Sequence, residues 1–253
     1  GANAIQSYLR DLNVNFRKTF AYVPEDELVL EAPLHAFKDE AFKTQKFDIL
    51  DTPGPNEAGA EALRTKVERL LHDVDVIIYL LDYTKLKTEE EKSLFARLSD
   101  TRTELIKQYE SRLFFVVNKI DMQNRTGLKP NETASYVVDI LKKQIPNLQI
   151  TQDRVILISA ENALLSRLID TDRASPAAIK DFIKKVFGEL AEDEISPEEF
   201  KPKAPELLKR SKFQDFENKI LTFIFKNRGY ILLQSIIGDI GRRQVAVIVD
   251  DRH

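Results

Sequence analysis

Four residues directly after a strongly apolar run carry the clearest chemical signal of the chain. Asn118, Lys119, Ile120 and Asp121 form an N-K-x-D pattern that follows the run LFFVV at 113–117. An ionised Asp121 carboxylate can accept two hydrogen bonds from the N1–H and N2–H₂ groups of guanine, a donor pair that adenine does not offer. The stem of Lys119 can lie along the base, and Asn118 can tie neighbouring loops together. The pattern predicts a guanine-binding loop, and the alternative is a polar loop that only closes a buried strand.

Two weaker signals flank this loop in the chain. The segment DTPG at 51–54 has the D-x-x-G form. There Asp51 can hold a water molecule of a Mg²⁺ ion, and Gly54 lets its backbone N–H approach a γ-phosphate. Ser159 and Ala160 follow the apolar run VILI and would bring a backbone N–H to the O6 atom of guanine. Each signal alone is common, but their order along the chain is that of the back half of a GTP-binding domain.

The elements that must position these residues alternate between strands and helices. Apolar and β-branched runs predict strands at 47–50, 74–81, 113–117 and 155–159, with a weaker strand at 28–37. Helical patterns occupy 2–13, 58–71, 89–110 and 132–144. This alternation predicts an α/β fold with a parallel sheet, and the candidate residues all follow strand ends, where such sheets build their sites.

The last third of the chain has a different character. Helical patterns occupy 177–190, 205–228 and 230–240, and the acidic, proline-rich segment 191–205 is typical of a surface connection. We therefore expect two domains: a nucleotide-binding domain over 1–175, and C-terminal helices over 176–253 that form a bundle or the start of a stalk.

Composition excludes several classes of function. The chain has 253 residues with no cysteine, so disulfide scaffolds and thiol catalysis are ruled out. A net charge of −3 argues against a nucleic-acid module held by net charge. No apolar run approaches the about 18 residues of a membrane-spanning helix. The predicted location is cytoplasmic, with peripheral association with a membrane or the nucleoid left open. His35, His72 and His253 are far apart in sequence and spell no metal site.

Three segments of the chain resemble bacterial dynamin-like GTPases. They are FDILDTPGPNEAG at 47–59, VIIYLLDYTKLK at 76–87 and FFVVNKID at 114–121. The likeness is greatest to the enterobacterial clamp-binding members associated with replication forks, and it is strong over 47–160. The resemblance implies a Rossmann-like P-loop GTPase fold of the dynamin type. It also implies Mg²⁺-dependent GTP hydrolysis coupled to self-assembly through the G domain or the helices, with a membrane or the replication machinery as a further partner.

The resemblance also assigns a role to each matching residue. Asp51 takes the Mg²⁺-water role, and the Gly54 N–H contacts the γ-phosphate. Asn118, Lys119 and Asp121 select guanine, and the loop of Ser159 and Ala160 contacts the base.

One departure from that family decides what the chain is expected to do. None of its eight glycines is followed by lysine, so the phosphate-binding loop G-x-x-x-x-G-K-[ST] is missing from the sequence. We expect a fragment that begins after this loop, hydrolyses nothing by itself and leaves GTP, GDP and Mg²⁺ unbound.

Two other classes of function stay open. One is a pseudo-GTPase that works by docking a protein partner. The other is an unrelated phosphotransferase in which Asp51 and Asp82 hold a metal ion together.

Overall fold

The computed structural model describes residues 49–50, 74–86, 107, 110–123, 127–145, 147–188 and 195–224. The chain divides into two compact units, Gly1–Leu71 and His72–His253, and every element described below belongs to the second. The helices predicted at 2–13, 58–71 and 230–240, the strand at 28–37 and most of the helix at 89–110 lie outside the described residues. In the strand predicted at 47–50, Ile49 and Leu50 are described and have no regular secondary structure.

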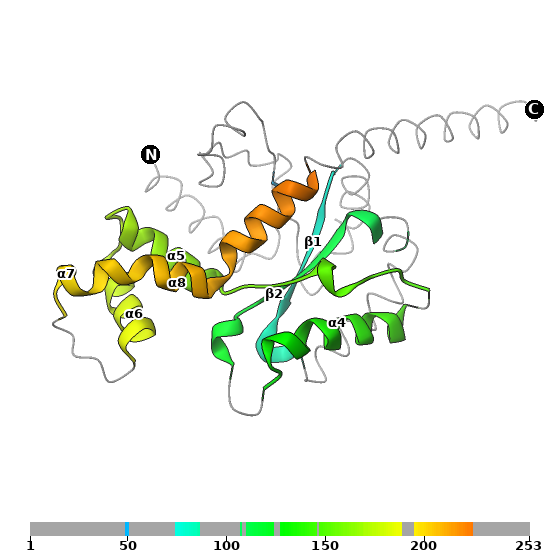
Figure 1. Cartoon of the computed structure of the whole chain (residues 1–253), viewed down its shortest axis with the longest axis horizontal. Helices are drawn as coiled ribbons and strands as arrows, with labels where there is room; N and C mark the ends of the chain where they lie inside the picture. Colours follow the sequence, from blue (N-terminus) through cyan, green and yellow to red (C-terminus); the bar gives the residue numbers. More distant parts are fainter. Residues whose placement is uncertain are drawn as a thin grey trace, which may run out of the picture. The chain divides into compact units, whose positions relative to one another are not determined.

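A parallel three-stranded sheet forms the centre of this unit (Figure 1). Its strands are β1 (Ile77–Asp82), β2 (Leu113–Asn118) and β3 (Val155–Leu157), in that order across the sheet. The predicted α/β fold with a parallel sheet is confirmed. β1 begins three residues later than predicted, at Ile77, and β3 ends two residues earlier, at Leu157.

Both faces of β2 are covered. Phe115 and Val117 point to one face and join a buried cluster with residues of α4 (Pro130–Gln144). Phe114 points to the other face, where its ring packs edge-on against Phe223 at 5.0 Å between ring centroids. Figure 1 shows the strands between α4 and the helical stretch 213–224 that carries Phe223. A strand buried on both faces explains why the run LFFVV has no polar alternation.

Helix α4 begins two residues before its predicted start. Pro130 occupies the first helical turn, where its missing N–H costs nothing. A carboxylate oxygen of Glu132 accepts a hydrogen bond from the Lys129 backbone N–H at 3.2 Å. These two features stabilise the start of the helix beside the sheet. Short 3₁₀ turns at Tyr83–Lys85, Glu110–Arg112, Ile120–Met122 and Gln152–Arg154 flank the strands.

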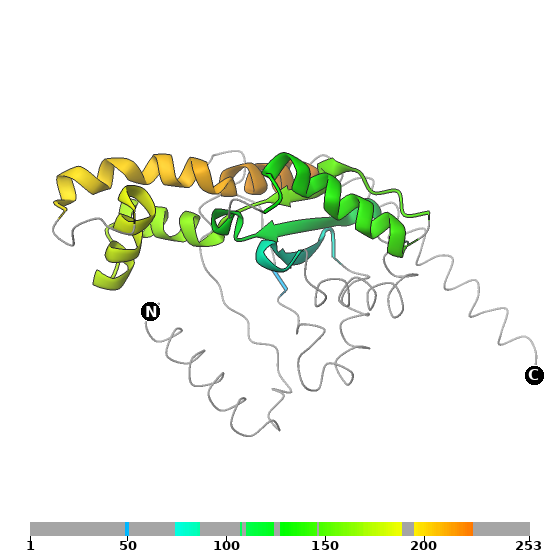
Figure 2. The same cartoon turned by 90° about the horizontal axis from the view of Figure 1, so that it is seen from below.

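Four helices form a second buried cluster, at one end of the unit (Figures 1 and 2). They are α5 (Ala160–Asp170), α6 (Pro176–Phe187), α7 (Pro197–Phe200) and α8 (Ala204–Ser211), with a 3₁₀ turn at Lys201–Lys203. Phe182 and Leu207 lie in its centre. None of the helices in the described part of the chain is long and apolar enough to cross a membrane.

Three sequence predictions for this region were incomplete. Segment 191–205, predicted as a surface connection, contains α7, whose Phe200 is buried among the helices. The helix predicted at 205–228 is interrupted at Lys212, which adopts a left-handed conformation with φ 55°. Helix α5 was not predicted, because its apolar stripe follows the β3 run without a turn signal.

Ser166→Ala is expected to lower the free energy of unfolding by about 1–2 kcal/mol. The Ser166 hydroxyl donates to the Ala204 carbonyl at 2.5 Å and joins α5 to α8, and both residues are buried, so the carbonyl would lose its partner in the interior. Urea unfolding followed by circular dichroism measures the change. Leu164→Ala on the same helix is the control, since Leu164 is 58% exposed, and should change stability by less than about 0.5 kcal/mol. Equal midpoints for the two variants would contradict the prediction.

Candidate functional site

The parallel sheet brings the predicted base-binding loops to one edge. Asp82 and Asn118 are register partners at the carboxyl ends of β1 and β2. Beyond β3, the Ile158 N–H donates to the Val117 carbonyl at 2.8 Å, and the Ile120 N–H donates to the Ile158 carbonyl at 3.2 Å. The N-K-x-D loop and the Ser159–Ala160 loop therefore lie side by side, although about 40 residues separate them in sequence.

Asn118 joins these two loops directly. Its side-chain oxygen accepts hydrogen bonds from the Lys119 N–H at 2.8 Å and from the Ala160 N–H at 2.9 Å. This is the tie between loops that the sequence led us to expect of an asparagine here. The Ala160 N–H, predicted to reach the O6 atom of guanine, is thus already engaged. Ser159 is fully buried, and its hydroxyl accepts from the Asn162 N–H, which caps α5.

Asn118→Ala is expected to loosen the Ser159–Ala160 loop, because two backbone N–H groups lose their acceptor. The amide of Ala160 should exchange its hydrogen faster, and the free energy of unfolding should fall by about 1–2 kcal/mol. Hydrogen exchange followed by NMR gives the residue-specific rate. Asn118→Asp keeps an acceptor oxygen at this position and should preserve the slow exchange. If the Ala160 amide exchanges at the same rate in the alanine variant, the tie has no such role.

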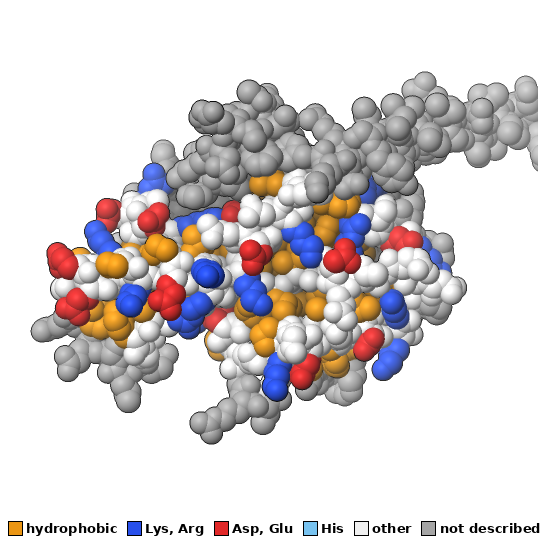
Figure 3. All heavy atoms as spheres, in the orientation of Figure 1, with side chains coloured by type: hydrophobic (Ala, Val, Ile, Leu, Met, Phe, Trp, Pro, Cys, Tyr) orange, Lys and Arg blue, Asp and Glu red, His pale blue; other side chains and the backbone are white. Residues whose placement is uncertain are grey.

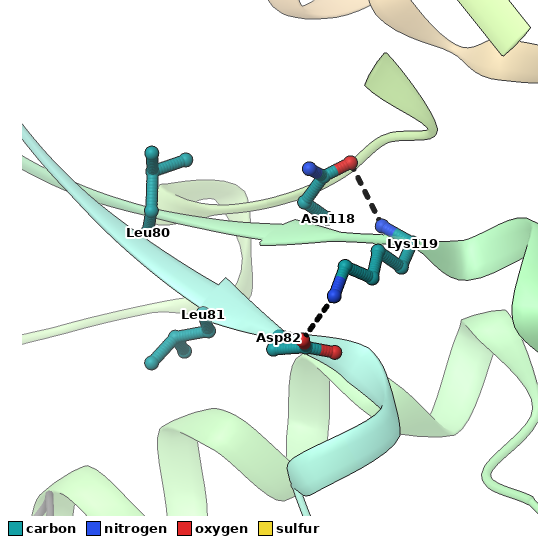
Figure 4. Close-up of a pocket in the computed structure, with 5 residues that line it drawn as sticks. All are labelled: Leu80, Leu81, Asp82, Asn118 and Lys119. Atoms are coloured by element: carbon teal, nitrogen blue, oxygen red, sulfur yellow. Dashed lines mark hydrogen bonds and ion pairs between the residues drawn. The ribbon is translucent and has the colours of Figure 1, made fainter. Parts of the chain in front are cut away.

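Lys119 turns the chain and reaches across the strand ends. Its backbone is left-handed, with φ 67° and ψ 33°, a conformation that costs a non-glycine residue about 1–2 kcal/mol. Its ammonium group lies 2.6 Å from a carboxylate oxygen of Asp82 (Figure 4). Strained backbone of this kind gathers at binding sites. Asp82, Asn118 and Lys119 line a pocket at the strand ends, together with Leu80 and Leu81 of β1. The side chains of the two leucines leave opposite faces of the strand (Figure 4).

Asp82 is held as an anion by its neighbours. Burial raises the pKa of its carboxyl, but hydrogen bonds from Lys119 and from the hydroxyl and N–H of Thr84 outweigh this and keep the pKa below its ordinary value. The Asp82 carboxylate is thus engaged by a cation, while Asp51, its partner in the metal-binding alternative, lies outside the described residues. Within the described ranges, no group of three or more His, Cys, Asp or Glu residues could hold a metal ion.

Asp121, the residue predicted to select guanine, is nine-tenths buried. A carboxylate oxygen of Asp121 lies 2.6 Å from the ammonium group of Lys185, near the end of α6. Burial raises the pKa of the Asp121 carboxyl, while hydrogen bonds from Lys185 and Ser159 lower it, and the net pKa lies below its ordinary value. Lys185 also contacts Glu161 at 2.9 Å. No sequence signal pointed to Lys185, because it lies 64 residues from Asp121.

The remaining candidate residues have no described position. Asp51 and Gly54, with the three histidines, lie outside the described residues. Lys201, in the 3₁₀ turn before α8, pairs with Asp172. Figure 3 shows Lys and Arg side chains interspersed with Asp and Glu over the face drawn.

Comparisons with known proteins match part of this chain to one protein family and to two curated relatives. The family model of the Gtr1/RagA G protein conserved region matches residues 17–157. Two curated relatives match, both named Clamp-binding protein CrfC, one from Escherichia coli strain K12 and one from Escherichia coli. Each is 30% identical over 96 residues, which are 38% of this chain and 12% of the relative. The match thus spans a small part of those proteins. No solved structure matches the chain.

Proposed function

The chain belongs to the Gtr1/RagA family of G proteins, and from this premise we propose that residues 74–224 contain the guanine-recognising half of a G domain. Membership of a G-protein family implies guanine-nucleotide binding. The finer assignment concerns which residues meet the base. Asn118, Lys119 and Asp121 select guanine, and the Ser159–Ala160 loop backs it.

The observation that carries this proposal is the hydrogen bond from the Ala160 N–H to Asn118. It joins the N-K-x-D loop to the second base loop, so both segments that would touch a guanine are built as one unit. A loop that merely closed a buried strand would need no such partner 42 residues away. The donor and acceptor set also fits the ligand, because the Asp121 carboxylate offers two acceptor oxygens for the two N–H donors of the guanine edge.

The phosphates would need other residues. The printed sequence contains no G-x-x-x-x-G-K-[ST] loop, whose backbone N–H groups and lysine hold the phosphates in P-loop proteins. We propose that GTP hydrolysis, with Asp51 holding a Mg²⁺-bound water and Gly54 at the γ-phosphate, occurs only where such a loop is supplied. These 253 residues alone would then be inactive.

The likeness to CrfC extends the proposal to partners. The parent protein would be a dynamin-type GTPase that assembles with itself through its G domain or helices. By the same likeness, its setting would be the cytoplasm, with the replication machinery or a membrane surface as its partner. The two CrfC proteins are named as clamp-binding, and the match to them covers 96 residues.

Guanine recognition by the chain is measured best with nucleosides, because they carry no phosphates and their binding needs no phosphate-binding loop. Contacts to the base alone support a dissociation constant of about 1 mM, so GTP or GDP at micromolar concentration would still be almost entirely unbound. In saturation-transfer NMR at millimolar ligand, guanosine should bind and adenosine should not, and Asp121→Ala should abolish the guanosine signal. Equal signals for both nucleosides, or none for either, would overturn the proposal. The protein-docking module would then be the better interpretation.

A further inference from the structure

The carboxylate that is expected to select guanine already has a cationic partner from within the chain. Lys185 donates to a carboxylate oxygen of Asp121 at 2.6 Å, and Asp121 is only 10% exposed. The neighbouring Ser159 hydroxyl also lowers the pKa of this carboxyl group. A guanine would need two acceptor positions on this group for its N1–H and N2–H₂ donors. The Lys185 ammonium group therefore occupies part of the acceptor capacity that the base requires.

The contact of Lys185 brings together residues from three separate elements. Asp121 belongs to the 3₁₀ turn after β2, Glu161 to the first turn of α5, and Lys185 to the last turn of α6. The Lys185 ammonium group lies between the two carboxylates, 2.6 Å from Asp121 and 2.9 Å from Glu161. Glu161 is 58% exposed, so water can solvate its carboxylate, whereas the Asp121 side chain is 10% exposed and depends more strongly on the charge of Lys185. The contact is therefore anchored chiefly on the base-selecting carboxylate.

We propose that Lys185 is an internal competitor of guanine: its ammonium group occupies Asp121 in the empty site and must leave, or turn toward Glu161, before the base is bound. This inference rests on the proposed function of Asp121. By this inference a residue on α6, outside both base-binding loops, affects the affinity of the site for guanine. Because Glu161 offers a second carboxylate within reach, Lys185 can release Asp121 without losing every ionic contact.

The pKa shifts agree with this geometry. Burial lowers the pKa of the Lys185 ammonium group, but the hydrogen bonds that it donates to Asp121 and Glu161 outweigh this and hold the pKa above its ordinary value. The pKa of the Asp121 carboxyl is lowered, so both partners stay charged at neutral pH. A charged pair that is largely withdrawn from water is a stronger competitor than an exposed one, since solvent screens it less.

Lys185→Met in the full chain tests the proposal, because methionine keeps much of the lysine stem and removes the charge. Guanosine titrations followed by NMR should show binding about five- to thirtyfold tighter than in the wild type. Adenosine should remain without binding. Lys185→Arg keeps a cation beside Asp121 and should bind guanosine as weakly as the wild type. Lys180→Met, an exposed lysine on the same helix, is the matched control and should also behave like the wild type.

A second measurement shows that the ion pair is lost and the protein is folded. The ¹³C shift of the Asp121 carboxyl, followed against pH, should titrate at a higher pKa in Lys185→Met than in the wild type, while the amide spectrum stays dispersed. With that shift present, unchanged or weaker guanosine binding would overturn the competitor role while leaving the proposed function intact. If neither the wild type nor any variant prefers guanosine to adenosine, both proposals fall together. Tighter binding in Lys185→Met and in Lys180→Met alike would also overturn the competitor role, because the effect would then be one of general charge.

Discussion

Asp121→Asn is expected to exchange the base preference of the protein from guanine to xanthine. The Asp121 carboxylate presents two acceptors, which match the N1–H and N2–H₂ donors of guanine. Asparagine presents one acceptor and one donor, so its NH₂ group meets the N2–H₂ group of guanine donor to donor. Xanthine has a carbonyl at C2, which accepts from the asparagine NH₂ group. Guanosine binding should weaken by about 30- to 1000-fold, since the loss is that of a charge-assisted pair.

The measurement is a competition between guanosine and xanthosine, followed by NMR, with the wild-type chain and the variant side by side. Xanthosine should bind the variant and not the wild type. Asp139→Asn changes an exposed carboxylate on α4 in the same way and should leave the guanosine preference as it is. If Asp121→Asn lost guanosine without gaining xanthosine, the carboxylate would matter for the loop's structure and not for reading the base.

Phosphate release from GTP by the purified chain is expected to stay at the rate of buffer with Mg²⁺ alone. Catalysis of phosphoryl transfer depends on positioned donors around the β- and γ-phosphates, and the loss of one such donor typically costs a factor of about 10²–10³. The printed sequence has no P-loop lysine and no P-loop Ser or Thr, so several donors are missing together. A colorimetric phosphate assay with a known GTPase as positive control measures this.

Asp51→Ala gives this second prediction its control. Asp51 is the residue assigned to the Mg²⁺-bound water, so a chain that does not hydrolyse GTP should behave identically with and without its carboxylate. Turnover that persists through further purification and disappears in Asp51→Ala would show that the chain is a GTPase by itself. Turnover that fades with purification in both forms would come from a contaminant and would leave the prediction standing.

The sequence by itself determined the sheet and the order of its loops. A run such as LFFVV is apolar at every position because β2 is covered on both faces, so its strand character could be predicted from composition alone. The carboxyl ends of parallel strands meet at one edge, which placed Asn118 near Ala160 before any coordinates were known. The N-K-x-D motif and the strand before it were thus sufficient to predict where the candidate base site lies.

Only the tertiary structure decided which partners hold the charged residues of that site. Lys119 reaches Asp82, 37 residues away, and Asp121 meets Lys185, 64 residues away. Hydrophobic periodicity reports which face of an element is buried, and it carries no information on which distant side chain crosses that face. The position of Lys185 depends on how α6 folds back against α5, an arrangement set by the packing of Phe182 and Leu165 in the helical cluster. For this reason the pairing of Lys185 with the Asp121 carboxylate could be found only in three dimensions.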